Sequence, residues 1–562
     1  MIRACSKSSI VRYKLPQSPQ RTQRGGHYLH SSNKISRVLC GLCGGLDFKQ
    51  ALRSLLLLAC FYAALSSSLL FAETNDKAEA IFSPYGPQKE KTVTTSHTAN
   101  IDGKAVSYDA TVGTQMLRDE SGKEKGLIFY TAYTRTDINQ SDASLRPLIF
   151  CFNGGPGSAS VWLHLGAFGP KRVNIDEEGL HTTLPFHLVP NPYSLLDIAD
   201  LVFIDPISTG YSRVIWNQDP KQFYNVDTDV ETVAEFIRVY TTRQEKWTAP
   251  KFVAGESYGT TRAVGLALEL HDKQHLFLNG VILISSVLNH MTLNFGNGND
   301  LVYTLYLPAY TKTALYYHKL SEEMQNNPEK ALRESREFAY GEYAESLFLG
   351  DRIDPQKRKK VIGKLAALTG LSPDYIEKSD LRVSQDHFAK ELLRSQNRVI
   401  GRFDSRYMGI DSNSLGAVYE CDPSFNAFLG LFTATFNDYV RRDLGWKTDE
   451  EYKILANVTP WGYNSTMGQT LNVSDKLQEV MDRNNRLRIY VAGGTYDLAT
   501  PYFATEYTFS HLGLLPSLKK HIELHLYEGG HMMYLNQNSI AQMKLDLSAF
   551  IRKALKDPNP AE

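Results

Sequence analysis

A serine within residues 255–259, Gly-Glu-Ser-Tyr-Gly, is the first candidate for covalent chemistry in this chain. The motif matches the pattern in which a nucleophilic serine stands on a tight turn between a strand and a helix. Glycines two residues on either side of Ser257 let the backbone crowd together without a Cβ clash. The apolar run 252–254 precedes the motif and a helix-prone run follows from Thr260. A glycine-flanked turn without chemistry would give the same motif, but this context favours Ser257 as a nucleophile.

A glycine-rich loop could supply a second hydrogen-bond donor for acyl transfer. Residues 153–157, Asn-Gly-Gly-Pro-Gly, directly follow the apolar run 148–152. Hydrolases with a serine on such a turn take one N–H donor from an early strand–helix loop and one from the residue after the serine. We therefore expect the N–H groups of Gly155 and Tyr258 to stabilise an oxyanion. A tight glycine turn is the alternative for this loop, and Asn153 could offer its amide to a carboxylate.

A serine nucleophile needs a general base, and the base needs a carboxylate that orients it. His531 lies in a Gly-Gly-His loop directly after the alternating apolar segment 522–527. Asp497 follows the apolar run 487–492, and an acid of this kind stands just past the carboxyl end of a strand. Alone, His531 could be an exposed loop histidine and Asp497 a turn cap. The order serine, acid, histidine together with Ser257 predicts a catalytic triad.

Short, uninterrupted apolar runs predict the elements that position these residues. Such runs are typical of parallel strands covered on both faces, and they occupy residues 148–152, 201–204, 252–254, 280–284 and 487–492. Helical patterns lie between them, at 228–240 and 260–270. Residues 92–136 instead alternate between apolar and polar, as in an antiparallel hairpin at a sheet edge. Alternating strands and helices argue for a doubly wound α/β sheet.

The alternation of strand and helix stops between about residues 292 and 480. This stretch is charged, helix-prone and rich in aromatics, and it contains no convincing central strand. Together with the serine turn, it predicts an α/β-hydrolase fold, with a mostly parallel central sheet and an inserted helical cap that shapes a pocket. The predicted organisation is a leader at 1–72, a first part of the core at 73–291, the cap at 292–480 and a second part of the core at 481–562.

The leader differs in composition from the rest of the chain. Basic residues are frequent up to Arg53 and acidic ones are nearly absent, and the apolar run 54–65 is followed by a short stretch ending at Ala72. This layout is that of a secretory signal cleaved near Ala72, which predicts a secreted or periplasmic protein. The basic region is unusually long. The alternatives are a translation start downstream of Met1 and an uncleaved membrane anchor formed by the same segment.

Four of the six cysteines lie in this leader, which leaves Cys151 and Cys421 in the rest of the chain. Two cysteines do not make a disulfide framework. Cys151 stands in the apolar run 148–152 and suits a buried thiol. One disulfide with Cys421 is the alternative in an oxidising compartment.

The balance of charges argues against nucleic acid as the main partner. Lys plus Arg and Asp plus Glu both number 61, whereas phosphate binding needs a basic excess. His271 and His275 have the spacing of two metal ligands on one helix face, but the glutamate that a zinc protease needs after the first histidine is absent. The sequence also contains no P-loop and no dinucleotide-binding motif. We therefore expect neither a metal nor a cofactor.

The combination of these blocks resembles the serine carboxypeptidase family. The resemblance covers about residues 148–534 and rests on motifs in the family's order: 153–157, Gly169-Pro170, 191–194, Asp205-Pro206, 210–212, 255–258, Asp497 and Gly530-His531. It implies hydrolysis of C-terminal residues from peptide substrates, often at acidic pH and without a cofactor. It implies that Ser257 is the nucleophile, His531 the base and Asp497 the orienting acid. It further implies that Gly155 and Tyr258 supply the two oxyanion donors. The substrate's terminal carboxylate would be bound by Asn153, Gly154 and Glu256.

Two positions depart from the family pattern. Ala167 stands where the family usually has a glutamate that helps to hold the substrate carboxylate. This position therefore supports neither exopeptidase specificity nor a strongly acidic pH optimum. Ser158 stands where the family usually has a cysteine. One alternative keeps the triad but changes the substrate, as in a proline-type aminopeptidase, an esterase or an acyltransferase. Another is a non-catalytic binding protein on the same scaffold, against which the complete triad argues.

Overall fold

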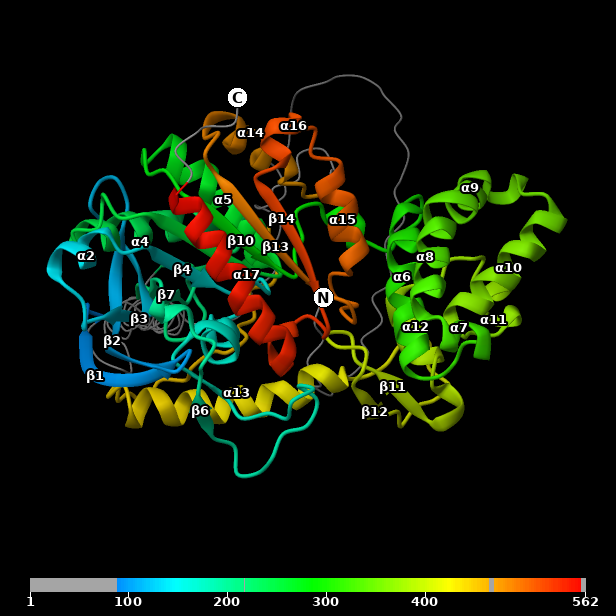
Figure 1. The fold of residues 1–562 in the computed structure, drawn as a ribbon, viewed down its shortest axis with the longest axis horizontal. Helices are drawn as coiled ribbons and strands as arrows, with labels where there is room; N and C mark the ends of the chain where they lie inside the picture. The colour runs from blue at the N-terminus through cyan, green and yellow to red at the C-terminus, as the bar shows by residue number, and fades with distance from the viewer. Residues whose placement is uncertain (1–87, 217, 464–469, 557–562) are drawn as a thin grey trace, which may run out of the picture. The chain divides into compact units, whose positions relative to one another are not determined.

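A mixed ten-stranded sheet forms the centre of the protein. The computed structural model describes residues 88–216, 218–463 and 470–556. Figure 1 shows the sheet running from the blue strands β1 and β2 to the orange strands β13 and β14. In spatial order the strands are β1 (Thr92–Ile101), β2 (Lys104–Arg118), β3 (Glu124–Arg135), β7 (Asp200–Ile204), β4 (Leu148–Phe152), β9 (Lys251–Glu256), β10 (Gly280–Ile284), β13 (Arg488–Gly494) and β14 (Ile522–Tyr527), with β8 (Arg213–Val214) paired to β3.

The strand directions follow the two kinds of apolar pattern in the sequence. From β7 to β14 neighbouring strands are parallel, and β4, β7, β9, β10 and β13 are buried along their whole length. From β1 to β7 neighbouring strands are antiparallel, and β1 alternates between exposed and half-buried residues. The predicted mostly parallel sheet is confirmed. The antiparallel edge contains three consecutive strands, β1 to β3, where a hairpin was predicted.

Alternate residues of the central strands face two layers of helices, because successive side chains of a strand point to opposite faces. In β10, Val281 and Leu283 belong to one hydrophobic cluster, and Ile282 and Ile284 belong to the other. Full burial of one such side chain contributes about 1.5–3 kcal/mol, so this alternation fixes which face each layer covers. The first layer consists of α4 (Val226–Arg243), α5 (Tyr258–Asp272) and α14 (Ser474–Arg483), and the second includes α13 (Pro423–Arg442) and α17 (Gln537–Lys556).

The segment between β10 and β13 packs in two places. Seven helices share a hydrophobic cluster of their own, and Figure 1 shows them together at the right. They are α6 (Leu301–Tyr316), α7 (Glu322–Asn326), α8 (Pro328–Phe338), α9 (Ala344–Leu349), α10 (Pro355–Thr369), α11 (Pro373–Lys378) and α12 (Gln385–Glu391). In contrast, α13 and α14 cover the faces of the central sheet. The segment between β10 and β13 thus supplies both a helical subdomain and two helices of the core layers.

A small hairpin follows α12 and leads back toward the sheet. It consists of β11 (Arg398–Ile400) and β12 (Met408–Ile410), which pair antiparallel. Leu498 and Tyr502, which come shortly after β13, join the cluster of the helical subdomain. The subdomain therefore packs directly against the segment that carries Asp497.

Two expectations concern the leader and the cysteines. The leader 1–72 lies outside the described residues, so the secretory signal stays a prediction. None of the described helices is long and apolar enough to cross a membrane. Cys151 is a buried free thiol in β4, so the possible disulfide with the exposed Cys421 is not formed.

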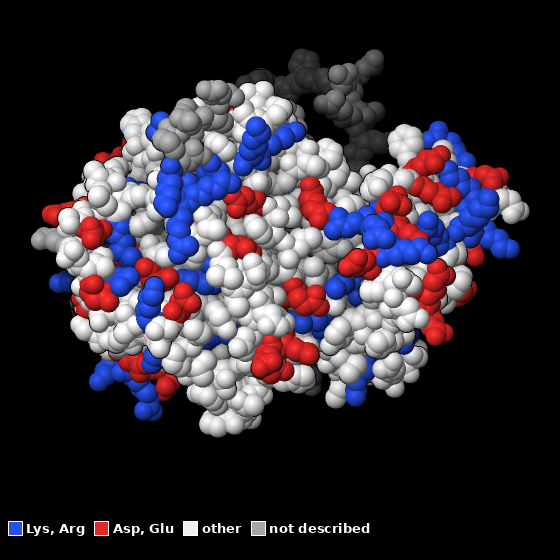
Figure 2. All heavy atoms as spheres, viewed as in Figure 1, with Lys and Arg blue, Asp and Glu red and all other residues white. Residues whose placement is uncertain are grey.

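Charged side chains of both signs are interspersed on the face that Figure 2 shows. Basic side chains gather there in small groups, with acidic ones close by. This distribution agrees with the equal numbers of acidic and basic residues in the sequence. The surface in this view is that of an ordinary globular protein.

Candidate active site

Ser257 stands on a sharp turn between β9 and α5. Its backbone has φ 60° and ψ −130°, a conformation that residues other than glycine rarely adopt. The turn requires glycine at position 255, because a Cβ added there would lie 2.1 Å from the Gly259 carbonyl oxygen, and space at Gly259 is also tight, with the Phe152 carbonyl oxygen 3.0 Å from an added Cβ. The Ser257 N–H donates to the Ile284 carbonyl (2.9 Å), which ties the turn to the end of β10. The strand–turn–helix setting expected for this motif is present.

Asp497 and His531 form a buried hydrogen-bonded pair just past the ends of β13 and β14. Nδ1 of His531 lies 2.7 Å from Oδ2 of Asp497, and neither side chain is more than 2% exposed. The carboxylate also accepts hydrogen bonds from the N–H groups of Ala499 (2.7 Å) and Thr500 (3.0 Å) and from the Thr500 hydroxyl (2.6 Å). Because the carboxylate occupies Nδ1, it fixes the ring orientation and leaves Nε2 as the acceptor.

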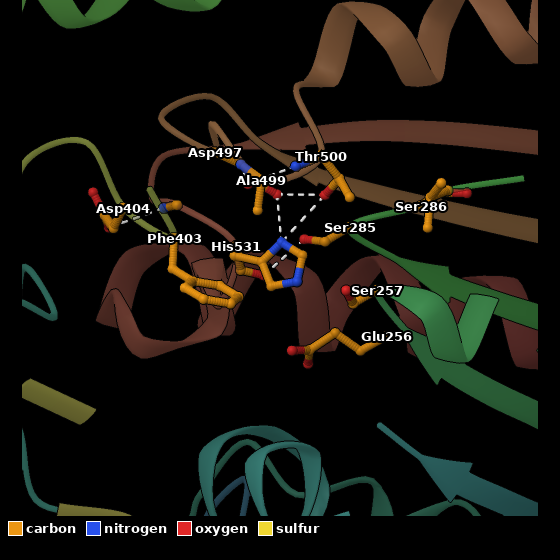
Figure 3. A network of polar contacts seen from close by, with 12 residues as sticks. Glu256, Ser257, Ser285, Ser286, Phe403, Asp404, Asp497, Ala499, Thr500 and His531 are labelled. Carbon is orange, nitrogen blue, oxygen red and sulfur yellow. Dashed lines mark hydrogen bonds and ion pairs between the residues drawn. The ribbon is translucent and has the colours of Figure 1, made fainter. Parts of the chain in front are cut away.

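Nε2 of His531 faces the serine. This nitrogen is buried and has no hydrogen-bond partner among the described residues. Figure 3 shows its side of the ring directed toward the Ser257 side chain, with Glu256 below. Between these two described residues, Ser257 and His531, no hydrogen bond is formed. Catalytic hydrogen bonds are often long without substrate and tighten when it binds. The structure thus brings the three predicted side chains together, with the hydroxyl and the imidazole facing each other.

The charges around His531 favour its protonated form. Burial, the strongest influence, lowers the pKa of His531, but the Asp497 carboxylate, its hydrogen bond and the Glu256 carboxylate raise the pKa above the ordinary value of 6.5. The positive charge of Arg402 opposes this rise. A raised pKa makes an imidazole a better proton acceptor.

The glycine loop after β4 lies directly against the serine turn. A Cβ on Gly154 would lie 2.5 Å from the backbone nitrogens of Tyr258 and Gly259, so only glycine fits there. Gly155 has φ +104°, which glycine adopts without strain. Among the described residues, the N–H groups of Gly155 and Tyr258 form no backbone hydrogen bond. Tyr258 is the first residue of α5, where the helix dipole favours negative charge. Two N–H donors beside Ser257 could therefore bind an oxyanion.

Glu256 is buried beside the serine with a phenol as its partner. Its Oε2 accepts a hydrogen bond from the Tyr534 hydroxyl (2.7 Å), and the Asn153 side chain supplies another. Burial raises the pKa of Glu256 to about 7, and the charge of His531 and these two hydrogen bonds limit the rise. Ala167 is buried in a hydrophobic cluster. Tyr534 was not predicted from the sequence, where its one signal is its position three residues after His531.

A segment of the insertion lies across the loop that carries His531. We call this segment, residues 402–406 between β11 and β12, the strap. The Phe403 carbonyl accepts the His531 N–H (2.5 Å), and Oδ2 of Asp404 accepts the Gly530 N–H (3.0 Å). The Phe403 ring meets the His531 ring edge-on, with centroids 4.9 Å apart (Figure 3). The strap therefore fixes both the backbone and the ring of His531.

The strap also holds the loop that carries Asp497. The Leu498 N–H donates to the Arg402 carbonyl (3.0 Å), and the Ser405 N–H donates to the Tyr496 carbonyl (3.0 Å). Phe403 and Asp404 thus bond to the His531 loop, while Arg402 and Ser405 bond to the Asp497 loop. Because one short segment bonds to both loops, it sets the position of the histidine relative to its acid. The strap was not predicted from the sequence, because an irregular loop within an insertion carries no periodic signal.

A family model matches most of the sequence, and individual known proteins match shorter parts of it. A family model described as serine carboxypeptidase matches residues 117–541. Retinoid-inducible serine carboxypeptidase of Rattus norvegicus is 29% identical over 171 residues, which cover 30% of this chain and 34% of that protein. Pheromone-processing carboxypeptidase KEX1 of Saccharomyces cerevisiae is 34% identical over 154 residues, which cover 25% of this chain and 20% of that protein. The chain thus matches about a third of the length of the first relative and a fifth of the second.

The architecture is also that of a known enzyme structure. The prohormone-processing carboxypeptidase KEX1(delta)P of Saccharomyces cerevisiae superposes with a TM-score of 0.51 and 16% identity, covering 79% of this chain and 92% of that chain. At this identity the likeness concerns the fold alone, and it confirms the predicted α/β-hydrolase fold. Since the family model spans well over half of the sequence, this chain belongs to the serine carboxypeptidase family.

Proposed function

We propose that this protein is an exported serine carboxypeptidase that removes C-terminal residues from peptides through an acyl-enzyme. Membership of the family supports the reaction class. The observation that carries the proposal is the buried Asp497–His531 pair, whose unoccupied Nε2 is directed at a serine on a strained turn. A buried ring nitrogen without a hydrogen-bond partner costs free energy. Abstraction of the Ser257 hydroxyl proton by this nitrogen explains why it is left without one.

Ser257 acts as the nucleophile and His531 as the base. As Oγ bonds to the scissile carbonyl carbon, Nε2 takes the hydroxyl proton, and Asp497 stabilises the imidazolium. The N–H groups of Gly155 and Tyr258 bind the carbonyl oxygen as it becomes negative. When the C–N bond breaks, His531 gives its proton to the leaving amine. Water then attacks the acyl-enzyme by the same route, and the proton returns to the serine.

Glu256, Asn153 and Gly154 bind the terminal carboxylate of the peptide. With a pKa of about 7, Glu256 is neutral in acid and can donate a hydrogen bond to that carboxylate. Above neutral pH the side chain is ionised and repels it. The partner of Glu256 is the Tyr534 phenol, and the pKa of Glu256 is about 7. We therefore expect affinity for free-acid peptides to fall as the pH rises through neutrality, and not already at strongly acidic pH.

Paired peptides test the exopeptidase reaction. The purified protein is incubated with peptides of one sequence that end in either a free carboxylate or an amide, and products are mapped by mass spectrometry. We expect stepwise loss of C-terminal residues from the free acids and little cleavage of the amides. Equal cleavage of both forms, or release of residues from the amino end, would refute the carboxypeptidase reaction while leaving serine chemistry intact.

The proposal of export rests on the leader, in which a basic region and the apolar run 54–65 are followed by a short stretch that ends at Ala72. N-terminal sequencing of protein recovered from the medium or periplasm should find a start close to residue 73. An intact leader on a protein that stays in the cytoplasm would contradict export.

A further inference from the structure

Arg402, in the strap, carries a guanidinium group that forms no ion pair with a carboxylate of the described residues. Its side chain is partly exposed, and its guanidinium lies near the Phe403 ring, 5.4 Å from Cζ to the ring centroid. Burial lowers the pKa of Arg402, but neighbouring phenols and carboxylates, Tyr419 first among them, raise it above its ordinary value. Other arginines near the site are occupied. Nε of Arg262 lies 2.8 Å from Oδ2 of Asp229. Nη2 of Arg406 lies 2.6 Å from Oδ2 of Asp404. In the described part of the chain Arg402 forms no ion pair of this kind.

The two carboxylates whose charges act on Arg402, those of Asp422 and Asp497, are already engaged. Oδ1 of Asp422 accepts the backbone N–H groups of Arg402 (3.2 Å), Ser424 (2.9 Å) and Phe425 (3.4 Å), as expected of the residue that caps α13. Asp497 accepts four hydrogen bonds, including that of His531. Neither acid therefore needs the guanidinium, and the guanidinium has hydrogen-bonding capacity to spare.

Arg402 stands beside the reacting groups. Its carbonyl accepts the Leu498 N–H (3.0 Å), and its ring partner Phe403 contacts the His531 ring at 4.9 Å. Its positive charge opposes the rise in pKa of His531. The same charge opposes the rise in pKa that burial causes in Tyr306, on α6 of the helical subdomain. Since the strap pins the backbone to both catalytic loops, the guanidinium lies at the boundary of the triad and the helical subdomain.

We propose that Arg402 binds a carboxylate of the substrate, which is either the terminal α-carboxylate or the side chain of an acidic residue next to the scissile bond. This inference rests on the proposed function. The planar fork of a guanidinium can donate two parallel hydrogen bonds to one carboxylate, and it stays charged at every pH at which the protein is folded. Unlike Glu256, Arg402 needs no proton change to bind an anion.

Two variants and a control test this role. Arg402→Gln removes the charge, Arg402→Lys keeps the charge but not the fork, and Arg398→Gln removes a nearby charge at the start of β11. Substrates are N-acyl dipeptides with Ala or Glu before a C-terminal Phe, and with Phe before a C-terminal Gln or Glu. Labelling with a fluorophosphonate shows that each variant has an intact serine site. The Michaelis constant is then measured for each pair.

The two sources of the carboxylate give different results. If the terminal group is the ligand, KM for every dipeptide rises roughly 10- to 100-fold in Arg402→Gln and less in Arg402→Lys. If a side chain is the ligand, that rise is confined to peptides with Glu next to the scissile bond. Unchanged KM for all peptides, or the same change in Arg398→Gln, would overturn the inference. A wild-type protein that cleaves none of the peptides would instead refute the proposed function.

The wild-type protein gives a second measurement that does not depend on the folding of a variant. Inhibition by N-acyl-phenylalanine is compared with inhibition by its amide above neutral pH, where Glu256 is ionised. N-acyl-glutamate and N-acyl-glutamine form the matching pair for the side chain. In at least one pair the carboxylate should still inhibit more strongly, because Arg402 keeps its charge. Equal inhibition within both pairs would overturn the inference.

Discussion

Gly530→Ala is expected to impair catalysis although residue 530 performs no chemistry. A Cβ at this position would lie 2.2 Å from the Phe403 carbonyl oxygen and 2.4 Å from Cβ of Asp404. Both contacts are with the strap, and one involves rigid backbone. Ordinary van der Waals contact needs about 3.5 Å, so the strap or the His531 loop must retreat by about 1 Å.

The size of the effect follows from what this retreat displaces. The His531 N–H bond to Phe403 (2.5 Å) and the Gly530 N–H bond to Asp404 (3.0 Å) cross the same contact. A shift of about 1 Å would weaken both and turn the imidazole away from the serine. A misplacement of that size costs about 100-fold in rate. We therefore expect Gly530→Ala to lower kcat by about 100-fold with a smaller change in KM.

The rate of serine labelling by a fluorophosphonate measures this effect directly, because it depends on the triad and not on peptide binding. Gly363→Ala on α10 is the matched control, since nothing lies within 4 Å of an added Cβ there, and we expect it to label at the wild-type rate. Thermal unfolding of both variants separates misplacement from loss of fold. A folded Gly530→Ala protein that labels as fast as wild type would show that the strap does not position His531.

Three further substitutions test the groups around the triad. In the wild type, KM for free-acid peptides should rise as the pH passes through about 7 and Glu256 loses its proton. Glu256→Gln should remove this rise, and a rise that persists in the variant would contradict the role of Glu256. Tyr534→Phe removes a hydrogen bond that lowers the pKa of Glu256, so the midpoint of the KM profile should move to higher pH, and a move to lower pH would contradict that assignment. Thr500→Val deletes the hydroxyl that donates to Asp497 (2.6 Å) and should lower kcat by about 10-fold; an unchanged kcat would mean that this bond does not orient the acid.

Features set by local spacing could be predicted from the sequence. The turn at Ser257 depends on glycines two residues away, and the loop at 153–157 depends on the strand directly before it. Asp497 and His531 were found because each follows a strand-like run. The parallel sheet follows from the same apolar runs, which need cover on both faces.

The strap and Tyr534 could not be predicted, because their contacts join distant parts of the chain. Asp404 and Gly530 are 126 residues apart in sequence, and Glu256 and Tyr534 are 278 residues apart. The packing of α13 and α14 on the central sheet is a similar case. An apolar stripe predicts that a helix is buried, but it does not identify the surface that buries it.

In the proposed reaction one serine hydroxyl, that of Ser257, is activated by His531 and attacks the peptide. The most direct measurement is the peptide turnover of purified Ser257→Ala protein beside wild type, with equal folding checked by thermal unfolding. Loss of the nucleophile should lower kcat by roughly 10⁶-fold. Turnover close to that of wild type would show that the reaction does not depend on Ser257 and would contradict the account.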